Sequence, residues 1–392
     1  MSETLPEAPW TQRDDLAQLV AALGVDTIRW VGGAVRDTLL GEDASDIDAA
    51  TPLLPDTVIA ACEAAGIRTV PTGIDHGTVT AVLSGGPVEI TTLRHDVSTD
   101  GRRATVRFAS DWREDAARRD FTINALFAHP ETLAVSDYFG GLDDLANRRV
   151  RFIGDARRRI REDHLRILRY FRFQARFGSQ LDEEAEEACA ELAATLKGLS
   201  RERVAGELLA LLSLPDPSAT VARMAKLGVL QVVLPETGKR EIAALERLVE
   251  TEKAQSAPPD TIRRLAALLP ALPDIAEAVA VRLRLSRAKR SHLACLAERS
   301  ASDAENPRAL AYREGMDCAR GRLLLAGAAT APLDGWTIPE LPLKGGEIVA
   351  RGVSAGPQVA RTLQAVERRW VEESFPPRAR VEELLSEELR AT

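Results

Sequence analysis

Apolar and polar residues form short alternating runs over the first 140 residues of the chain. Runs of β-branched and apolar residues predict strands, and apolar residues at every third or fourth position predict helices between them. The predicted strands cover 28–31, 67–71, 77–83, 87–94, 103–108 and 133–139, and the predicted helices cover 11–23, 34–41, 55–65 and 115–127. Short strands with interspersed helices are typical of a domain built on one mixed sheet.

After Gly140 the strand pattern disappears and amphipathic helices follow one another. They are predicted at 156–177, 182–196, 201–213, 217–228, 241–251, 260–269, 272–284 and 287–299, with several more beyond. The expected fold class is therefore α+β, with an N-terminal mixed sheet followed by an all-helical remainder. A length of 392 residues suits several domains, and we expect four: 1–140, 141–213, 214–270 and 271–392.

The composition predicts neither a membrane protein nor a cysteine-based site. No apolar run reaches the roughly 18 residues of a membrane span, and the N-terminus MSETLPEAPW lacks a basic and apolar leader. We therefore expect a cytoplasmic location. Cys62, Cys189, Cys295 and Cys318 are widely spaced without a CxxC pair. This spacing indicates neither zinc nor a disulfide framework, so reduced structural thiols are expected.

Positive charge is concentrated in one segment of an acidic chain. The formal net charge is −8, yet residues 148–176 hold eleven arginines and three acidic residues. Such a segment either binds a polyanion locally or is a solvated helix with many ion pairs. Because three acids cannot pair eleven arginines, the count favours a phosphate-binding face.

A strand followed by two glycines is the first motif that carries chemistry. The predicted strand 28–31 runs into Gly32 and Gly33, where a strand-to-helix turn needs a positive φ or close approach to a ligand. Backbone N–H groups at the start of the next helix suit a phosphate. Gly41 is expected to end that helix. An ordinary structural turn is the alternative.

An acidic pair, Asp46 and Asp48, follows shortly afterwards. With one residue between them, both carboxylates face the same side of an extended segment. Two such oxygen ligands suit Mg²⁺. Glu89 lies mid-strand between Val88 and Ile90 and faces the opposite side from them. On a neighbouring strand it would be the third carboxylate of a two-metal site, whereas alone it would be an ordinary exposed residue.

The segment ARRDFTINALF places Arg118 and Arg119 before Asp120, which we expect to cap a helix. Arginines here suit contacts with a triphosphate, and Asp120 suits a ribose hydroxyl. Capping alone explains Asp120 equally well. Asn124 lies four residues later on the same face of the predicted helix, within reach of a sugar or a carboxylate.

The segment REDHLRILR predicts a polar helical face. At helical spacing, Asp163, Arg166 and Arg169 lie on one side, and Glu162 lies four residues before Arg166. A carboxylate accepts from an exocyclic amine, and a guanidinium donates to a ring nitrogen or carbonyl, so this face can read the edge of a base. Ion pairs that only stabilise the helix are the alternative.

Together, these motifs resemble a known family. The chain carries GGAVRD with D-I-D, VEITTLR, ARRDFTINAL, GLDDL…VRFIGDARRRIREDHLRILRYFRF and SRERVAGELLALL. The order and approximate spacing of these motifs resemble those of the class II nucleotidyltransferases, which comprise bacterial tRNA CCA-adding enzymes and poly(A) polymerases. The resemblance covers residues 28–213, and KGGEIVARGVSAGPQVARTL resembles the tail of CCA-adding members. It implies a catalytic head at 1–140, a neck at 141–213, a body at 214–270 and a tail at 271–392.

The resemblance also implies an activity and a set of site residues. The activity would be addition of C, C and A to the 3′ end of tRNA from CTP and ATP, with Mg²⁺ as the cofactor. Asp46 and Asp48 would bind the metal and, with Glu89, form the catalytic group. Asp163 and Arg166 would act as an amino-acid template for the incoming base. The candidate nucleotide-binding residues are Gly32, Gly33, Arg36, Asp37, Arg119, Asp120, Asn124, Asp163, Arg166 and Arg169.

Two further segments separate this chain from its possible relatives. Residues 95–106 resemble the flexible loop of the family, which CC-adding members carry in a shortened or altered form, and SRERVAGEL resembles the neck motif that supports the template helix. Poly(A) polymerases carry a basic GRRF-like stretch where this chain has TGIDHGTVTAVL, which favours CCA addition. A poly(A) polymerase, a CC-adding enzyme and a non-catalytic RNA-binding protein are the alternatives.

Overall fold

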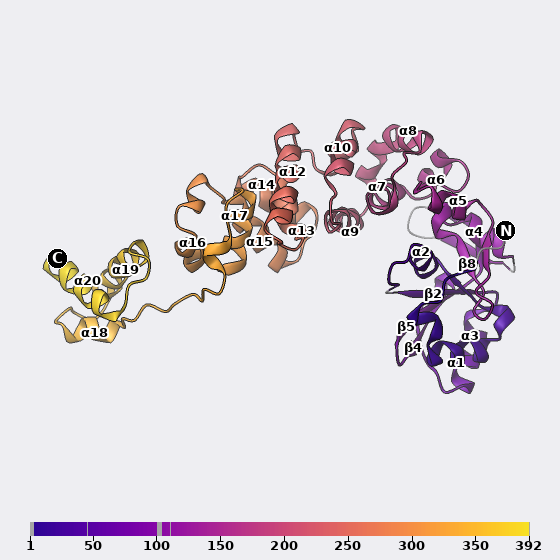
Figure 1. Ribbon diagram of the computed structural model, residues 1–392, viewed down its shortest axis with the longest axis horizontal. Helices are drawn as coiled ribbons and strands as arrows, with labels where there is room; N and C mark the ends of the chain where they lie inside the picture. Colours follow the sequence, from indigo (N-terminus) through magenta and orange to yellow (C-terminus); the bar gives the residue numbers. More distant parts are fainter. Residues whose placement is uncertain (1–3, 45, 100–103, 110, 392) are drawn as a thin grey trace. The chain divides into compact units, whose positions relative to one another are not determined.

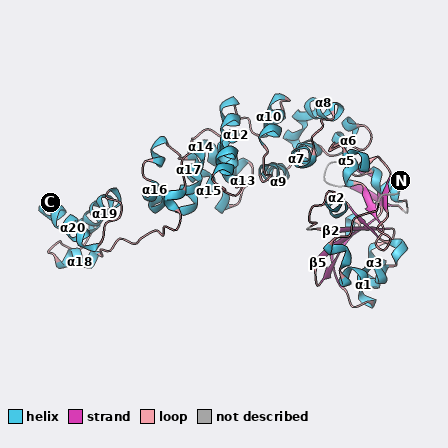
Figure 2. Cartoon of the chain, viewed as in Figure 1, coloured by secondary structure: helices cyan, strands magenta, loops and turns pink. Residues whose placement is uncertain are grey.

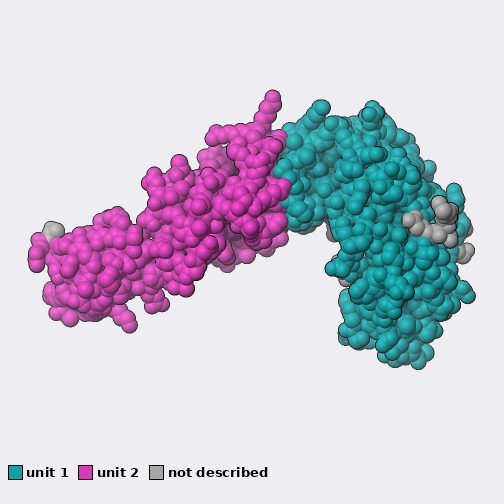
Figure 3. All heavy atoms as spheres, in the orientation of Figure 1, with its two compact units in different colours: residues 1–235 teal, residues 236–392 magenta. Residues whose placement is uncertain are grey.

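The chain forms two compact units. The computed structural model describes residues 4–44, 46–99, 104–109 and 111–391. The first unit is Met1–Pro235 and the second is Glu236–Thr392 (Figure 3). The finer division into four domains stays a prediction.

A seven-stranded mixed sheet forms the centre of the N-terminal part (Figures 1 and 2). Its order is β3-β4-β5-β2-β1-β8-β9, and neighbours pair antiparallel except β2 and β5, which are parallel. The strands are β1 Arg29–Val31, β2 Ile47–Thr51, β3 Arg68–Gly73, β4 Thr78–Leu83, β5 Gly86–Thr92, β8 Leu126–Ala128 and β9 Val135–Asp137. A separate hairpin pairs β6 Arg94–Thr99 with β7 Ala104–Phe108. The mixed sheet followed by helices confirms the expected α+β class.

Four helices pack on or beside this sheet. They are α1 Asp14–Leu23, α2 Gly33–Leu39, α3 Pro55–Ala64 and α5 Gly141–Ala146. Helix α1 packs on α3, and α3 packs on β3 and β4. Helix α2 contacts β1, β2 and β8. The start of α2 therefore lies beside the central strands of the sheet.

The helix expected at 115–127 is wrong. Helix α4, Trp112–Ala117, ends early, and Thr122–Asn124 forms a single 3-10 turn before β8. All three residues of β8 are at most 1% exposed. An amphipathic helix would leave one side in solvent, whereas a central strand is covered on both faces. The apolar run is therefore buried as a strand beside β1.

Six α-helices follow α5 in the described part of the first unit. They are α6 Ala156–Glu162, α7 Arg166–Phe177, α8 Glu183–Leu192, α9 Arg201–Leu212, α10 Ser218–Lys226 and α11 Val229–Val233. The single helix expected at 156–177 is wrong, because Asp163 has extended backbone (φ −149°, ψ 106°) and separates α6 from α7. Phe173 of α7 packs against Phe121 of the head, with ring centres 5.2 Å apart. Aromatic packing thus holds α7 against the sheet domain.

The second unit is helical, as the sequence predicts. Its helices are α12 Lys239–Ala254, α13 Thr261–Ala267, α14 Pro273–Arg282, α15 Arg287–Ala297, α16 Pro307–Glu314, α17 Met316–Leu325, α18 Gly345–Ala350, α19 Pro357–Glu372 and α20 Arg378–Ala391. In its interior, the buried Glu252 accepts hydrogen bonds from Arg263 and Arg264, each at 2.8 Å. Within the described residues, no helix is long and apolar enough to cross a membrane.

The expectation of four reduced cysteines is wrong for one pair. Cys295 in α15 and Cys318 in α17 form a disulfide, while Cys62 and Cys189 are buried free thiols. Helices α15 and α17 pack side by side, which brings together residues 23 positions apart. The wide spacing of the cysteines in the sequence gives no sign of this contact.

Candidate active site

One cavity in the first unit gathers almost all the candidate residues. Its volume is about 760 Å³, and its lining includes every candidate nucleotide-binding residue together with Asp46 and Asp48. Glu89 does not line it. Nine arginines and five aspartates contribute to the wall. This excess of positive charge suits an anionic ligand.

The two glycines shape the turn between β1 and α2. Gly32 has a φ of 74°, which favours glycine, and Gly33 is the first residue of α2. A Cβ atom on Gly32 would lie 3.7 Å from Arg119 Nη1 and 3.8 Å from Asp48 Oδ2. The bare backbone therefore keeps the helix start open between a cation and a carboxylate. Gly41, with a φ of 73°, follows α2 as predicted.

The acidic pair lies at the start of β2. Asp48 is opposite Val31 of β1 and opposite Glu89 of β5 in the sheet register, an adjacency that the sequence alone does not reveal. Burial and the charges of Glu89 and Asp46 raise the pKa of Asp48 to about 6, although Arg119 lowers it. Among the described residues, no three His, Cys, Asp or Glu side chains are grouped closely enough to hold a metal ion. A cation at this pair would thus complete its coordination with water or phosphate.

A buried carboxylate holds the two arginines of the ARRD turn. Asp115 in α4 is 1% exposed and forms ion pairs with Arg118 at 2.7 Å and with Arg119 at 3.1 Å. Burial by itself would raise the pKa of Asp115, but Arg119 and Arg118 lower it below its ordinary value. Asp115 therefore stays ionised and fixes both guanidinium groups. It is absent from the predicted site, although its helical spacing from the arginines could have indicated it.

Asp120 is the centre of a hydrogen-bond network. Its Oδ1 accepts from the Phe121 N–H at 2.9 Å and from the Asn124 amide at 3.0 Å, and its Oδ2 accepts from Arg169 at 2.6 and 2.8 Å. Burial would raise the pKa of Asp120, but Arg169 and these hydrogen bonds lower it to about 2. The expected role as a helix cap is wrong, because no α-helix follows. Asp120 instead ties α7 to the ARRD turn.

Arg36 and Asp37 line the cavity but bind each other. Arg36 Nε donates to Asp37 at 2.8 Å, and Arg36 Nη1 donates to Asn124 Oδ1 at 2.6 Å. The guanidinium also lies 4.3 Å from the centre of the Phe177 ring, and Arg176 of α7 donates to Asp37 at 3.3 Å. Because Arg36 is only 5% exposed, it orders the wall of the cavity. A direct contact of Arg36 with the nucleotide stays a prediction.

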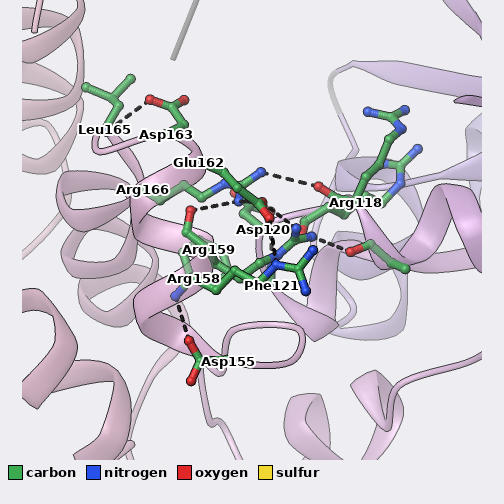
Figure 4. A network of polar contacts seen from close by, with 12 residues as sticks. Arg118, Asp120, Phe121, Asp155, Arg158, Arg159, Glu162, Asp163, Leu165 and Arg166 are labelled. Atoms are coloured by element: carbon green, nitrogen blue, oxygen red, sulfur yellow. Dashed lines mark hydrogen bonds and ion pairs between the residues drawn. The ribbon is translucent and has the colours of Figure 1, made fainter. Parts of the chain in front are cut away.

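The candidate base-reading residues lie at the break between α6 and α7 rather than on one helical face (Figure 4). Asp163 Oδ1 accepts from the Leu165 N–H at 3.1 Å, and Oδ2 accepts from Arg203 at 2.7 Å. Arg166, the first residue of α7, donates to Glu162 at 2.8 Å. Because the backbone is extended at Asp163, its carboxylate accepts from the N–H two residues later and stays at the cavity wall.

Helix α9 supports these residues with two side chains. Arg203 holds Asp163, and Glu207 accepts from Arg172 at 2.6 Å and lies 3.6 Å from Arg169. These contacts agree with the supporting role expected for the segment SRERVAGEL. Neither Arg203 nor Glu207 is singled out by the sequence, because only the fold brings α9 beside α7.

Acidic residues outside the arginine-rich segment pair several of its arginines. Arg149 and Arg151 donate to the fully buried Asp144 at 2.6 and 2.9 Å. Arg157 donates to Glu191 at 2.7 Å. Counting charges only within 148–176 therefore overstates the positive charge that is free to bind phosphate.

Comparisons with known proteins match both the sheet domain and the helices after it. A family model described as "Poly A polymerase head domain" matches residues 28–151, and one described as "Probable RNA and SrmB- binding site of polymerase A" matches residues 178–239. The Mus musculus protein "CCA tRNA nucleotidyltransferase 1, mitochondrial" is 36% identical over 379 residues, which are 92% of this chain and 86% of the mouse protein. The chain belongs to this nucleotidyltransferase family.

Bacterial members of the nucleotidyltransferase family are also similar to the chain. A "CCA-adding enzyme" of Geobacillus sp. (strain WCH70) is 39% identical over 202 residues, which are 51% of this chain and 49% of that protein. The crystal structure of the Bacillus stearothermophilus CCA-adding enzyme in complex with CTP matches with a TM-score of 0.76 and 26% identity, covering 98% of this chain and 99% of that one. The family expected from the motifs is therefore confirmed.

The segment that resembles the flexible loop of this nucleotidyltransferase family forms the hairpin of β6 and β7. Residues 100–103, which connect the two strands in the sequence, lie outside the described residues. Arg94, at the base of the hairpin, lines the cavity. The hairpin thus reaches the candidate active site at its base.

Proposed function

We propose that the protein adds C, C and A to the 3′ end of tRNA, using CTP and ATP without a nucleic-acid template and releasing pyrophosphate. The observation that carries this proposal is that Asp163 and Arg166 line the same cavity as Asp46 and Asp48. Asp163 and Arg166 on one wall can read a base, while Asp46 and Asp48 on another can support transfer of the nucleotidyl group. The names of the mouse and Geobacillus relatives, and the CTP complex of the similar structure, support the same activity.

The chemistry of the base-reading wall explains the choice of nucleotides. C and A each present an exocyclic amine next to a ring nitrogen acceptor, whereas U and G present a carbonyl next to a ring N–H. Asp163 accepts from the amine and Arg166 donates to the ring acceptor. This arrangement favours CTP and ATP and disfavours UTP and GTP.

The other walls match the remaining parts of a nucleotide. Arg118 and Arg119, both held by Asp115, suit the triphosphate, since guanidinium groups form bidentate contacts with phosphate. The start of α2 after Gly32 adds backbone donors for the same group. Asp120 suits a ribose hydroxyl.

The acidic pair suits Mg²⁺, which usually binds through one or two carboxylates and fills its other positions with water and substrate phosphates. Asp46 and Asp48 supply two such oxygen ligands. When bound there, Mg²⁺ would activate the 3′ hydroxyl of tRNA and neutralise charge on the triphosphate. Glu89 is the register partner of Asp48, but among the described residues no third acidic side chain is grouped with the pair, so its role as a third carboxylate stays a prediction.

Mg²⁺ binding should weaken in acid, because Asp48 must lose its proton to bind a cation. Its pKa of about 6 lies above the ordinary value of 3.8, so protons compete with the cation below that pH. We expect the dissociation constant for Mg²⁺ to rise about 10-fold from about pH 7 to about pH 5, as measured by isothermal titration calorimetry.

The stability of the protein without added divalent cations should show the opposite trend. The folded state holds the Asp48 proton more tightly than the unfolded state, so the contribution of Asp48 to stability falls as pH rises from 3.8 to about 6. Asp48→Asn should remove both pH effects. An equal affinity for Mg²⁺ at both pH values would contradict this assignment.

One assay tests the proposed activity against its alternatives. Purified protein is incubated with a tRNA that lacks its 3′-terminal CCA, with each nucleotide triphosphate alone and then with CTP and ATP together. We expect two additions with CTP alone, three with both, and no further extension, because template side chains rather than a growing tail determine the product. Gel electrophoresis at single-nucleotide resolution measures the length.

The other outcomes identify the rivals. A long tail made with ATP alone would indicate a poly(A) polymerase, and a product that stops at CC with both nucleotides would indicate a CC-adding enzyme. No extension at all would indicate a binding protein. The expected cytoplasmic location stays a prediction, since the mouse relative is described as mitochondrial.

A further inference from the structure

Arg159 lies in α6, outside the lining of the cavity, and caps the helix that precedes the ARRD turn. Its side chain is 10% exposed. Arg159 Nη2 donates to the backbone carbonyls of Ala117 and Arg119, the latter at 2.7 Å, and Nη1 donates to Glu162 at 2.5 Å (Figure 4). Ala117 is the last residue of α4, and carbonyls at a helix C-terminus lack helical partners. A buried guanidinium satisfies them at the negative end of the helix dipole.

Arg166 binds the backbone carbonyl that lies between the two that Arg159 binds. Its Nη2 donates to the Arg118 carbonyl at 3.3 Å, and its Nη1 donates to Glu162 at 2.8 Å and to the Arg159 carbonyl at 2.9 Å. Two guanidinium groups that share Glu162 therefore hold three successive carbonyls, those of residues 117–119. This cluster of Arg159, Arg166 and Glu162 is the clamp on the ARRD turn.

We propose that Arg159 is a positioning residue that sets the separation between the triphosphate and the base of the incoming nucleotide. The inference rests on the proposed function. The turn that Arg159 holds carries Arg118 and Arg119, while the carboxylate that it binds orients Arg166. Arg159 thus fixes the phosphate-binding wall relative to the base-reading wall without touching the nucleotide. Selective addition requires this fixed separation, because the triphosphate and the base of one nucleotide must contact their walls at the same time.

The test is Arg159→Ala, which removes the Arg159 contacts of the clamp and leaves every cavity-lining side chain chemically unchanged. Incorporation of CTP, ATP, UTP and GTP into a tRNA lacking CCA is measured separately, under single-turnover conditions and at saturating nucleotide. We expect C and A addition to slow about 10- to 100-fold, since small misplacements of reacting groups have effects of this size. Incorrect nucleotides should slow less, so the ratio of correct to incorrect addition should fall about 10-fold.

This ratio separates positioning from stability. A residue that only stabilises the fold would lower the fraction of active protein and slow all four nucleotides equally. The matched control is Arg158→Ala, because the Arg158 side chain is 81% exposed and only approaches Glu162, at 3.5 Å. Its ratio should stay within about 2-fold of wild type, as expected for a surface ion pair.

A second variant covers the case in which Arg159→Ala does not fold. Arg159→Lys keeps the cation but lacks the planar fork that reaches two carbonyls and Glu162, so the ratio should still fall about 3-fold or more. An unchanged ratio in the folded Arg159 variants overturns the inference. If the wild-type protein does not prefer CTP and ATP, the proposed function is wrong, and this inference is wrong with it.

Discussion

Asp48→Asn is expected to abolish addition of all three nucleotides to tRNA while the fold stays intact. Asparagine keeps the shape of the side chain but removes the negative charge that a catalytic cation needs. We expect the rate to fall by about 10³-fold or more, which corresponds to about 4 kcal/mol of lost transition-state stabilisation. Single-turnover incorporation of labelled CTP measures the loss. Because burial and nearby charges raise the pKa of Asp48, thermal unfolding at neutral pH should show no loss of stability.

Two variants from the same part of the chain make this result specific. Asp43→Asn changes an exposed carboxylate outside the cavity lining, three residues before Asp46, and should keep activity within about 3-fold of wild type. Glu89→Gln tests whether Glu89 is the third carboxylate of the metal site. A loss of activity as large as that of Asp48→Asn would place Glu89 at the metal. Asp48→Asn protein with more than about a tenth of wild-type activity would falsify the assignment of the acidic pair.

The second large effect concerns the choice of nucleotide. Arg166→Ala should reduce discrimination against UTP and GTP by about 10- to 100-fold, because a good bidentate contact with a base edge contributes about 1–3 kcal/mol. Binding of the triphosphate should be retained, since Asp115 still holds Arg118 and Arg119, and Arg159 still holds the backbone of their turn. Values of kcat/KM for the four nucleotides measure the discrimination, and competition by pyrophosphate measures triphosphate binding.

Arg166→Lys separates geometry from charge in this experiment. Lysine keeps the cation but not the planar pair of donors, so the lysine variant should lose most of the discrimination as well. If the alanine variant still chose CTP and ATP as strictly as the wild type, Arg166 would have no part in reading the base.

The grouping of the glycine turn with the acidic pair could be predicted because both motifs are local. A glycine at the end of a strand and two aspartates two residues apart depend only on backbone geometry, and the structure places Gly32, Asp46 and Asp48 in one cavity. The supporting residues come from distant segments. Arg203 contacts a residue 40 positions away, and no local pattern marks it as a partner of Asp163.

Secondary structure was hardest to predict where burial or a side-chain contact overrides periodicity. The apolar run of β8 is equally compatible with a buried helix until β1 is known to pair with it. The helical pattern through 156–177 hides the interruption at Asp163, which depends on a hydrogen bond to the Leu165 N–H. The disulfide between Cys295 and Cys318 likewise depends on helix packing.

The polar side chains of the cavity bind one another, and this makes nucleotide selection an exchange reaction. Asp163 has a partner in Arg203, Arg166 in Glu162, and Asp120 in Arg169. An incoming base gains from these groups only the difference between its own hydrogen bonds and those it replaces. A mismatched base must therefore replace hydrogen bonds within the protein without forming equally good ones. The internal pairs of arginines and carboxylates thus compete with the binding of every wrong nucleotide.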